Sequence, residues 1–285
     1  HAVKASRVYL PHCASAFIGA DCLCAMLACG MTEAEAPCAL LDLGTNGELA
    51  VFNGTELWCA STAAGPAFEG AGLTMGMPAV PGAINHVERK GFRIGCTAIG
   101  GVPAKGICGS GLIDAAAVLR QSGVLDAEGS LQREGHPFRA MVCEIGGAPA
   151  VRFAGTGVLL TQADIRALQV AKAAVCAGLQ MLLDRAEIRP EKLEKLFLAG
   201  GFGRFIRLES AAQIGLFPPA LLGRTAAIGN AALDGAGLLA LRPARRERLL
   251  SLVGRIHTVS LAEEPAFEQA YLEGMRFPNE NYMGR

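Results

Sequence analysis

An acidic residue followed by a glycine-rich turn is the first feature of this sequence that could do chemistry. Asp42 ends an apolar run, and the residues that follow are Gly44, Thr45, Asn46, Gly47 and Glu48. Glycine lets a backbone approach a ligand closely, and a hydroxyl with successive backbone N–H groups can donate to phosphate oxygens. Asp42 can hold a water of a metal ion, and Glu48 can orient water or metal. The pattern predicts a β-hairpin whose turn binds phosphate, although an ordinary tight hairpin with a solvated Glu48 gives the same signal.

Two other glycine clusters stand at predicted element boundaries. A buried-type strand over 195–199 runs into Gly200, Gly201, Phe202 and Gly203, which leave room for a flat ring or a ribose against the backbone. Gly109, Ser110 and Gly111 precede an apolar helix from Leu112 to about Leu119. A helix N-terminus behind such a loop is an anion site, and Ser110 could donate to phosphate or act as a plain helix cap.

Composition limits the classes of function. The 285 residues are 51% hydrophobic and 18% charged, and 26 basic residues balance 26 acidic ones. Such a balance argues against a nucleic-acid partner. The most apolar stretch, residues 13–31, is broken by Gly19 and Asp21 and is interpreted as a buried helix rather than a membrane span. We therefore expect neither nucleic acid nor membrane as a partner, and a cytoplasmic location.

The cysteines and histidines do not form metal-binding patterns. None of the ten cysteines forms a Cys-x-x-Cys pair, and none of the five histidines forms a His-x-x-x-His pair. Iron–sulfur and zinc spacings are therefore absent from the sequence. Most cysteines lie among Ala, Leu and Val, where a free thiol behaves as a small buried hydrophobe in a reducing compartment.

The elements that must position these residues follow from periodicity and turn signals. Three strands at 38–44, 47–53 and 55–61 are predicted to form an antiparallel meander, followed by a long glycine-rich loop over 62–86. Further strands are expected at 139–145, 149–153, 195–199 and 255–261. Helices are expected at 21–29, from Thr161 with Asp164 as a capping box, and at 207–215, 229–241, 243–253 and 263–274. Strands followed by helix–strand alternation indicate an α/β fold with a mixed sheet.

This order of motifs resembles the actin, heat-shock ATPase and sugar-kinase superfamily, and more narrowly the ATP-dependent reductive activators of corrinoid proteins. The resemblance covers at least residues 19–236. It is carried by Gly19-Ala20-Asp21, Asp42-Leu43-Gly44-Thr45-Asn46-Gly47-Glu48, Ala64-Gly65-Pro66-Ala67-Phe68-Glu69-Gly70, the segment from Gly106 to Asp114, Ala199-Gly200-Gly201-Phe202-Gly203 and Gly229-Asn230-Ala231-Ala232.

The resemblance implies an α/β fold of the actin-like ATPase (ribonuclease H-like) type, with a mixed sheet and flanking helices, forming the carboxy-terminal part of a larger two-lobed fold. Residues 1–37 would then be the end of the preceding lobe with a connecting helix, and 38–285 the second lobe. Asp42 to Glu48 would be the second phosphate loop, with Asp42 and Glu48 catalytic and Asp42 on the metal side. Gly200 to Gly203 would be the adenosine loop.

The same resemblance implies ATP and Mg2+ as cofactors and a corrinoid protein or methyltransferase as the partner. Family members use ATP to drive reduction of a cobalt(II) corrinoid to cobalt(I), with the electron passing through an iron–sulfur cluster. A homodimer is left open. Two family features are absent: a first Asp-x-Gly-Thr phosphate loop before residue 42, and any cluster spacing. Both absences are expected if this is a carboxy-terminal piece, with the cluster in the missing amino-terminal region and ATPase activity weak or absent in this piece alone.

Three other functions remain open at this point. The chain could belong to an ATPase that activates another iron–sulfur or radical enzyme, similar to the activators of acyl-CoA dehydratases. It could also be a small-molecule kinase of the same superfamily, although the carboxylate base that such a kinase needs in its first domain is absent. A non-catalytic assembly module, in which the glycine loops only shape a surface, is the remaining alternative.

Overall fold

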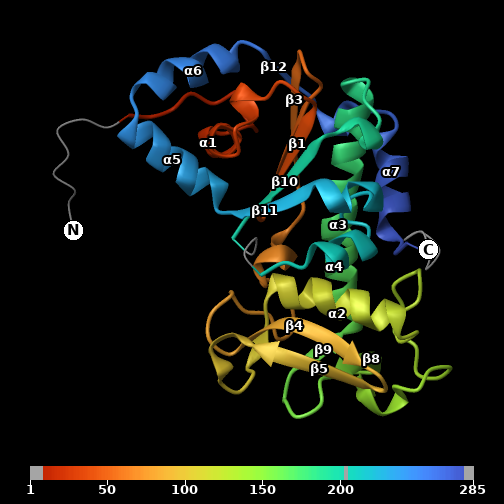
Figure 1. Cartoon of the computed structure of the whole chain (residues 1–285). Coiled ribbons are helices and arrows are strands. Elements are labelled where there is room, and N and C mark those ends of the chain that lie inside the picture. Colours follow the sequence, from red (N-terminus) through yellow and green to blue (C-terminus); the bar gives the residue numbers. More distant parts are fainter. Residues whose placement is uncertain (1–8, 202–204, 279–285) are drawn as a thin grey trace.

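The computed structural model describes residues 9–201 and 205–278. Its main sheet has six strands in the order β11-β10-β1-β2-β3-β12 (Figure 1). Their bounds are β1 Cys38–Leu43, β2 Gly47–Phe52, β3 Leu57–Thr62, β10 Lys195–Ala199, β11 Thr225–Gly229 and β12 Ile256–Thr258. Strands β1, β10 and β11 run parallel, whereas β2 is antiparallel to both β1 and β3. The fold is therefore α/β with a mixed sheet, as predicted.

Helices cover both faces of this sheet (Figure 1). On one face lie α1 Ala20–Ala28, α5 Ala231–Leu241 and α6 Ala244–Val253, and on the other lie α3 Gln162–Arg185, α4 Leu208–Gln213 and α7 Phe267–Met275. Side chains of β1 alternate between two apolar cores, with Leu40 packed toward α1 and Leu41 toward α3. This alternation is the period of two expected of a strand buried on both faces.

A smaller part of the chain packs beside the main sheet (Figure 1). It contains α2 Gly109–Gln121 and two three-stranded sheets with the orders β5-β4-β6 and β7-β8-β9. The strands are β4 Ala83–Lys90, β5 Arg93–Ala98, β6 Gly106–Ile107, β7 Val142–Ile145, β8 Ala148–Arg152 and β9 Leu159–Thr161. Apolar residues of α2 and α3 belong to one continuous core, so the smaller part is joined to the main sheet by packing.

The longest helix, α3, begins at the predicted capping box. The Thr161 side chain accepts from the Asp164 backbone N–H, and the Asp164 carboxylate accepts from the Thr161 N–H at 2.8 Å. Within the described ranges, α3 is the one helix whose length and apolar composition would let it cross a membrane, and 72% of its most apolar window is buried inside the protein. That burial is typical of a core helix.

The buried Lys172 of α3 ties down the segment that follows α7. Its Nζ donates to the carbonyl oxygens of Gly274 and Arg276, the second at 2.7 Å, and lies 5.0 Å from the centre of the Phe277 ring. Burial lowers the pKa of Lys172 to about 8. Removal from water disfavours the charged form of the ammonium, and the two backbone carbonyls offset part of that cost. The contact is structural, because it joins α3 to the segment after α7.

The structure corrects several sequence-based boundaries. The loop predicted over 62–86 ends at β4, which begins at Ala83, and neither β5 nor β11 was predicted. The helix expected from Leu112 begins three residues earlier, at Gly109. The first hairpin turn consists of residues 44–46, and neither Asn46 nor Gly47 has a positive φ, so the Asn-Gly pair does not form the left-handed turn that its sequence favours.

Candidate functional site

The candidate site lies at one edge of the main sheet, where three parallel strands end together. In the register of the sheet, Asp42 at the end of β1 stands beside Ala199 of β10, and Ala199 stands beside Gly229 of β11. Glu48 at the start of β2 faces Asp42 across the hairpin. Ligands of open α/β sheets bind outside the carboxyl ends of parallel strands, so this edge is the expected place for one.

The turn of the first hairpin is held by the loop that follows β3. The Thr45 hydroxyl donates to Glu69 Oε2 at 2.7 Å, and the Thr45 carbonyl accepts from the Gly65 N–H at 2.8 Å. A Cβ added to Gly44 would lie 3.3 Å from Glu69 Oε1. Thr45 and Asn46 are exposed, as a phosphate turn requires, but the Thr45 hydroxyl is engaged by Glu69 in this structure.

Three acidic side chains share this edge, and two of them have strongly shifted pKa values. Burial, and then the charge of Asp21, raises the pKa of Asp42 to about 6. Burial, followed by the charges of Asp21 and Asp42, raises the pKa of Glu48 to about 7, although the Ser61 hydroxyl donates to it at 3.4 Å. Carboxylates that repel one another favour a cation or a proton between them. Asp21, in the first turn of α1, was named from the sequence as part of the Gly19-Ala20-Asp21 motif but was not predicted as a site residue.

The glycine segment after β10 closes against the hairpin. Gly200 has a φ of +132°, its N–H donates to the Gly229 carbonyl, and an added Cβ would lie 2.4 Å from the Leu43 carbonyl oxygen. Gly201 is exposed, has no positive φ, and no described atom lies within 4 Å of an added Cβ. The strained position is therefore Gly200, and Gly201 is open. Phe202 and Gly203, the other predicted adenosine-loop residues, lie outside the described residues.

A small cavity of about 190 Å³ joins two of the glycine clusters. Gly201 and Gly109 both line it, together with Phe68, Glu69, Pro78, Ala79 and Cys108. The structure thus brings the glycine segment after β10, the start of α2 and the loop that holds Thr45 to one place. The binding roles assigned to the three glycine clusters from the sequence stay predictions.

The remaining residues of the α2 cluster face the core. Ser110 is 1% exposed, and its hydroxyl donates to the Asn85 carbonyl at 3.2 Å. A Cβ on Gly111 would lie 2.1 Å from the Ile84 carbonyl oxygen. The predicted phosphate role of Ser110 and Gly111 is thus not matched by their placement, because both serve the close packing of α2 on β4.

One turn further along α2, Asp114 forms a buried ionic cluster that the sequence did not predict. Its Oδ2 lies 3.1 Å from His86 Nδ1 and 3.5 Å from Arg207 Nε, and it accepts from the Val87 N–H at 3.4 Å. Asp114 is 0% exposed. Its partners come from β4 and from the start of α4, and no local pattern in the sequence connects them.

Metal ligands are sparse at this edge. The described ranges contain no group of three or more His, Cys, Asp or Glu side chains placed to hold a metal ion. All ten cysteines are free thiols, and burial raises the pKa of Cys29 to about 11 and that of Cys38 to about 12. A divalent ion beside Asp42 would take most of its ligands from phosphate and water, which is the habit of Mg2+.

Comparisons with known proteins agree on one family. The family model described as the C-terminal domain of RACo, the ASKHA domain, matches residues 36–284. The chain is 35% identical over 278 residues to the corrinoid activation enzyme RamQ of Eubacterium limosum. It is 27% identical over 279 residues to the [Co(II) methylated amine-specific corrinoid protein] reductase of Methanosarcina barkeri. These matches cover 92% and 90% of this chain.

A solved structure confirms the fold. The reductive activator for corrinoid, iron–sulfur protein superposes with a TM-score of 0.90 at 29% identity, over 97% of this chain and 45% of that one. The chain spans about half the length of its relatives, since it covers 46% of the first curated protein and 48% of the second. The actin-like ASKHA fold that the sequence predicted is therefore confirmed, and the division at residue 37 stays a prediction.

Proposed function

Because the chain belongs to the family of C-terminal ASKHA domains of RACo, we propose that it binds Mg-ATP at the carboxyl edge of its main sheet and so drives the reductive activation of a corrinoid protein. The single observation that supports this most is the convergence of the 44–46 turn, Gly200–Gly201 and Gly109 beside the repelling pair Asp42 and Glu48. Backbone amides and glycine space suit a phosphate and an adenosine, and paired carboxylates suit its magnesium ion.

Each residue at the edge takes a role that its surroundings favour. Asp42 would hold a magnesium-bound water, because its charge is unfavourable where it stands and a cation relieves it. Glu48, with a pKa of about 7, would accept a proton from the attacking water near neutral pH. The turn of residues 44–46, in which Thr45 and Asn46 are exposed, would face the phosphates, with Thr45 exchanging its bond to Glu69 for one to phosphate. The predicted contact of Gly47 is less favoured, because Gly47 is buried.

The corrinoid step extends the proposal to the longer proteins of this family. Both curated relatives are named for corrinoid activation or reduction, which supports a corrinoid protein as the partner and cobalt(II) to cobalt(I) reduction as the step that ATP drives. The cysteines of this chain offer no cluster spacing, so the electron carrier would come from elsewhere in the system. The names favour this over an activator of another radical enzyme or a small-molecule kinase.

Nucleotide binding can be tested on the 285-residue chain itself by amide NMR. Titration with Mg-ATP should shift the resonances of Gly44, Asn46, Gly109 and Gly201 in a saturable way, with weak affinity because half of the cleft is contributed by the other lobe in this fold. Gly201→Val should abolish the shifts, since it fills the cavity that Gly109 shares. Gly237→Val on the exposed side of α5 is the matched control. Saturable shifts confined to another surface would refute this location.

The corrinoid step needs a protein of the relatives' length. Joined to the amino-terminal half of the E. limosum relative, this chain should support ATP-dependent reduction of the corrinoid cobalt to cobalt(I). The visible absorption spectrum of the corrinoid protein measures this reduction. Asp42→Ala in that chimera should keep nucleotide binding and lose turnover, because the metal's water loses its partner. Normal turnover in a folded Asp42→Ala chimera would show that this edge is not the catalytic one.

A further inference from the structure

Glu69 connects two parts of the candidate site. Its Oε2 accepts from the Thr45 hydroxyl at 2.7 Å. The same residue lines the cavity of about 190 Å³ that Gly109 and Gly201 also line. Glu69 therefore contacts the turn of residues 44–46 and borders the space between the two other glycine segments.

The carboxylate of Glu69 faces the turn with both of its oxygens. Oε2 takes the Thr45 hydroxyl, and Oε1 would lie 3.3 Å from a Cβ added to Gly44. A hydroxyl has a single hydrogen to donate, so Thr45 cannot donate to Glu69 and to a phosphate oxygen at once. In this structure the carboxylate thus occupies the donor that a phosphate at this turn would need.

The backbone on both sides of Glu69 is closely packed. Phe68, directly before it, is 0% exposed, and a Cβ on Gly109 would overlap the Phe68 carbonyl oxygen. Gly70, directly after it, has a φ of +74°, and a Cβ there would overlap backbone of the loop that precedes β4. The side chain of Glu69 is therefore the part that can turn away from Thr45 while the backbone stays in place.

Glu69 stands apart from the two carboxylates that would share a magnesium ion. After burial, the charges that raise the pKa values of Asp42 and Glu48 come from Asp21 and Asp42, and Glu69 is not among them. A cation beside Asp42 would leave the negative charge of Glu69 at the turn. That charge opposes a phosphate at Thr45, because like charges a few Å apart repel each other.

We propose that the hydrogen bond between Thr45 and Glu69 is a latch, which closes the phosphate turn in the absence of nucleotide and lowers the affinity of the site. This inference rests on the proposed Mg-ATP site. Opening the latch releases the Thr45 hydroxyl to a phosphate oxygen and moves the Glu69 carboxylate away from the phosphates. Because Phe68 packs against the start of α2, the closed latch also ties the first hairpin to the smaller part of the chain.

The latch predicts tighter nucleotide binding when the charge of Glu69 is removed. In the amide NMR titration, Glu69→Gln should bind Mg-ATP at least about fivefold more tightly than the unsubstituted chain, because an uncharged acceptor holds Thr45 less strongly and does not repel phosphate. Urea denaturation should show no gain in stability, whereas a purely structural contact would lower stability without raising affinity. Glu69 is exposed, so the substitution is not expected to unfold the chain.

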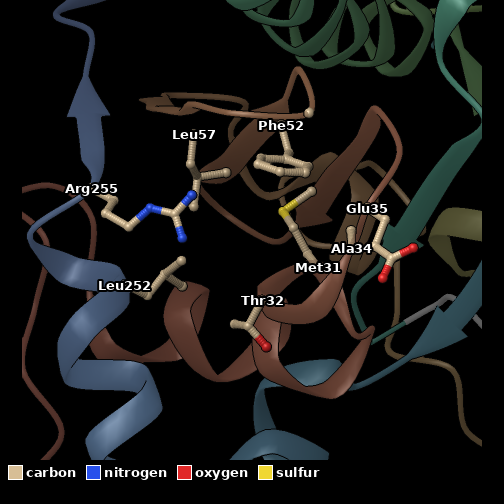
Figure 2. A pocket seen from close by; sticks show the side chains of 9 residues that line it. Met31, Thr32, Ala34, Glu35, Phe52, Leu57, Leu252 and Arg255 are labelled. Atoms are coloured by element: carbon tan, nitrogen blue, oxygen red, sulfur yellow. The ribbon is translucent and has the colours of Figure 1, made fainter.

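Glu35→Gln is the matched control, because it removes the same charge from an exposed residue at the other end of the main sheet. Glu35 lines a cavity with Phe52, the last residue of β2, whereas the candidate site lies at Gly47, the first residue (Figure 2). The affinity of this variant for Mg-ATP should stay within about twofold of the unsubstituted chain.

Thr45→Val separates the latch from charge repulsion alone. This variant has no hydroxyl to release, so adding Glu69→Gln to it should improve affinity by less than half as much as in the unsubstituted chain. The same gain with and without the Thr45 hydroxyl would overturn the latch, and so would an unchanged or weaker affinity in Glu69→Gln. No saturable shift in either the unsubstituted chain or Glu69→Gln would instead refute the nucleotide site on which the latch rests.

Discussion

The start of α2 and the carboxyl edge of the main sheet both combine glycines with a carboxylate, but they treat them in opposite ways. At α2, Gly111 is pressed against backbone, and the buried Asp114 has three hydrogen-bonding or ion-pairing partners. At the sheet edge, Gly201 is open and Asp42 and Glu48 repel each other. In the first region the fold itself fills the glycine space and engages Asp114 Oδ2, although the buried Oδ1 has no hydrogen-bond partner among the described residues. The second region keeps space and charge that a ligand can satisfy.

This contrast separates two meanings of a glycine-rich motif. A glycine can be required because another part of the protein occupies its Cβ position, or because a ligand does. Substitutions that add one methyl group at each place therefore test the comparison directly, through opposite effects on folding and binding.

The largest effect is expected for Gly111→Ala. The added Cβ would lie 2.1 Å from the Ile84 carbonyl oxygen, which is backbone and cannot rotate away. We expect the free energy of unfolding to fall by at least about 3 kcal/mol, measured by urea denaturation. Gly237→Ala, in the interior of α5 with open space around it, is the control and should be neutral or stabilising. A loss below about 1 kcal/mol in Gly111→Ala would remove the structural half of the comparison.

Asp114→Ala comes next and tests whether the α2 carboxylate is structural. The substitution removes the acceptor shared by His86, Val87 and Arg207, of which Arg207 has a side chain 42% exposed and can be hydrated again. We expect a loss of about 2–3 kcal/mol in unfolding free energy. Asp234→Ala, on the exposed side of α5, is the control. If both variants lost the same small amount, Asp114 would not be the anchor that its burial indicates.

The buried, mutually repelling carboxylates at the sheet edge should make the free energy of unfolding depend on pH. The folded pKa values of Asp42 and Glu48, about 6 and about 7, lie above their ordinary values of 3.8 and 4.5. The folded state thus binds more protons between these limits, so this contribution to stability is fully present below about pH 4 and is lost as the pH rises through 6 to 7. We expect a loss of roughly 1–2 kcal/mol from this pair after allowance for solvent screening.

Urea titrations from pH 4 to pH 8 measure this slope. Asp42→Asn combined with Glu48→Gln should flatten it and should raise stability at pH 8, because the repulsion is gone. An unchanged slope in the double variant would mean that the two carboxylates are not strained. Residues of functional sites commonly reduce stability, so we expect the double variant to be more stable and to lose nucleotide turnover.

The sequence predicted the parts of the fold that local signals determine. The capping box at Thr161 and the meander of β1, β2 and β3 were found because their patterns lie within a few residues. Strand β4 was missed because it follows a loop without period, and its partner β6 is two residues long. Sequence could not separate Ser110 from Gly201, because whether the space beside each residue is filled depends on distant parts of the chain. Asp114 and Arg207 are likewise 93 residues apart and meet only in the folded protein.

The smallest effect on folding is expected for Gly201→Ala, the counterpart of Gly111→Ala. Gly201 is exposed, lacks a positive φ, and has no described atom within 4 Å of an added Cβ, so alanine needs neither strain nor rearrangement. We expect the free energy of unfolding to change by no more than about 0.5 kcal/mol. Gly201 nevertheless lines the cavity that Gly109 also lines, so we expect added bulk at this position to weaken the Mg-ATP shifts in the amide NMR titration. Gly200→Ala is the control for a glycine at the same edge that the fold does require. Its φ is +132°, and an added Cβ would lie 2.4 Å from the Leu43 carbonyl oxygen, so alanine should destabilise the fold. If Gly201→Ala destabilised the chain as strongly as Gly111→Ala, the open space at the sheet edge would belong to the fold and not to a ligand.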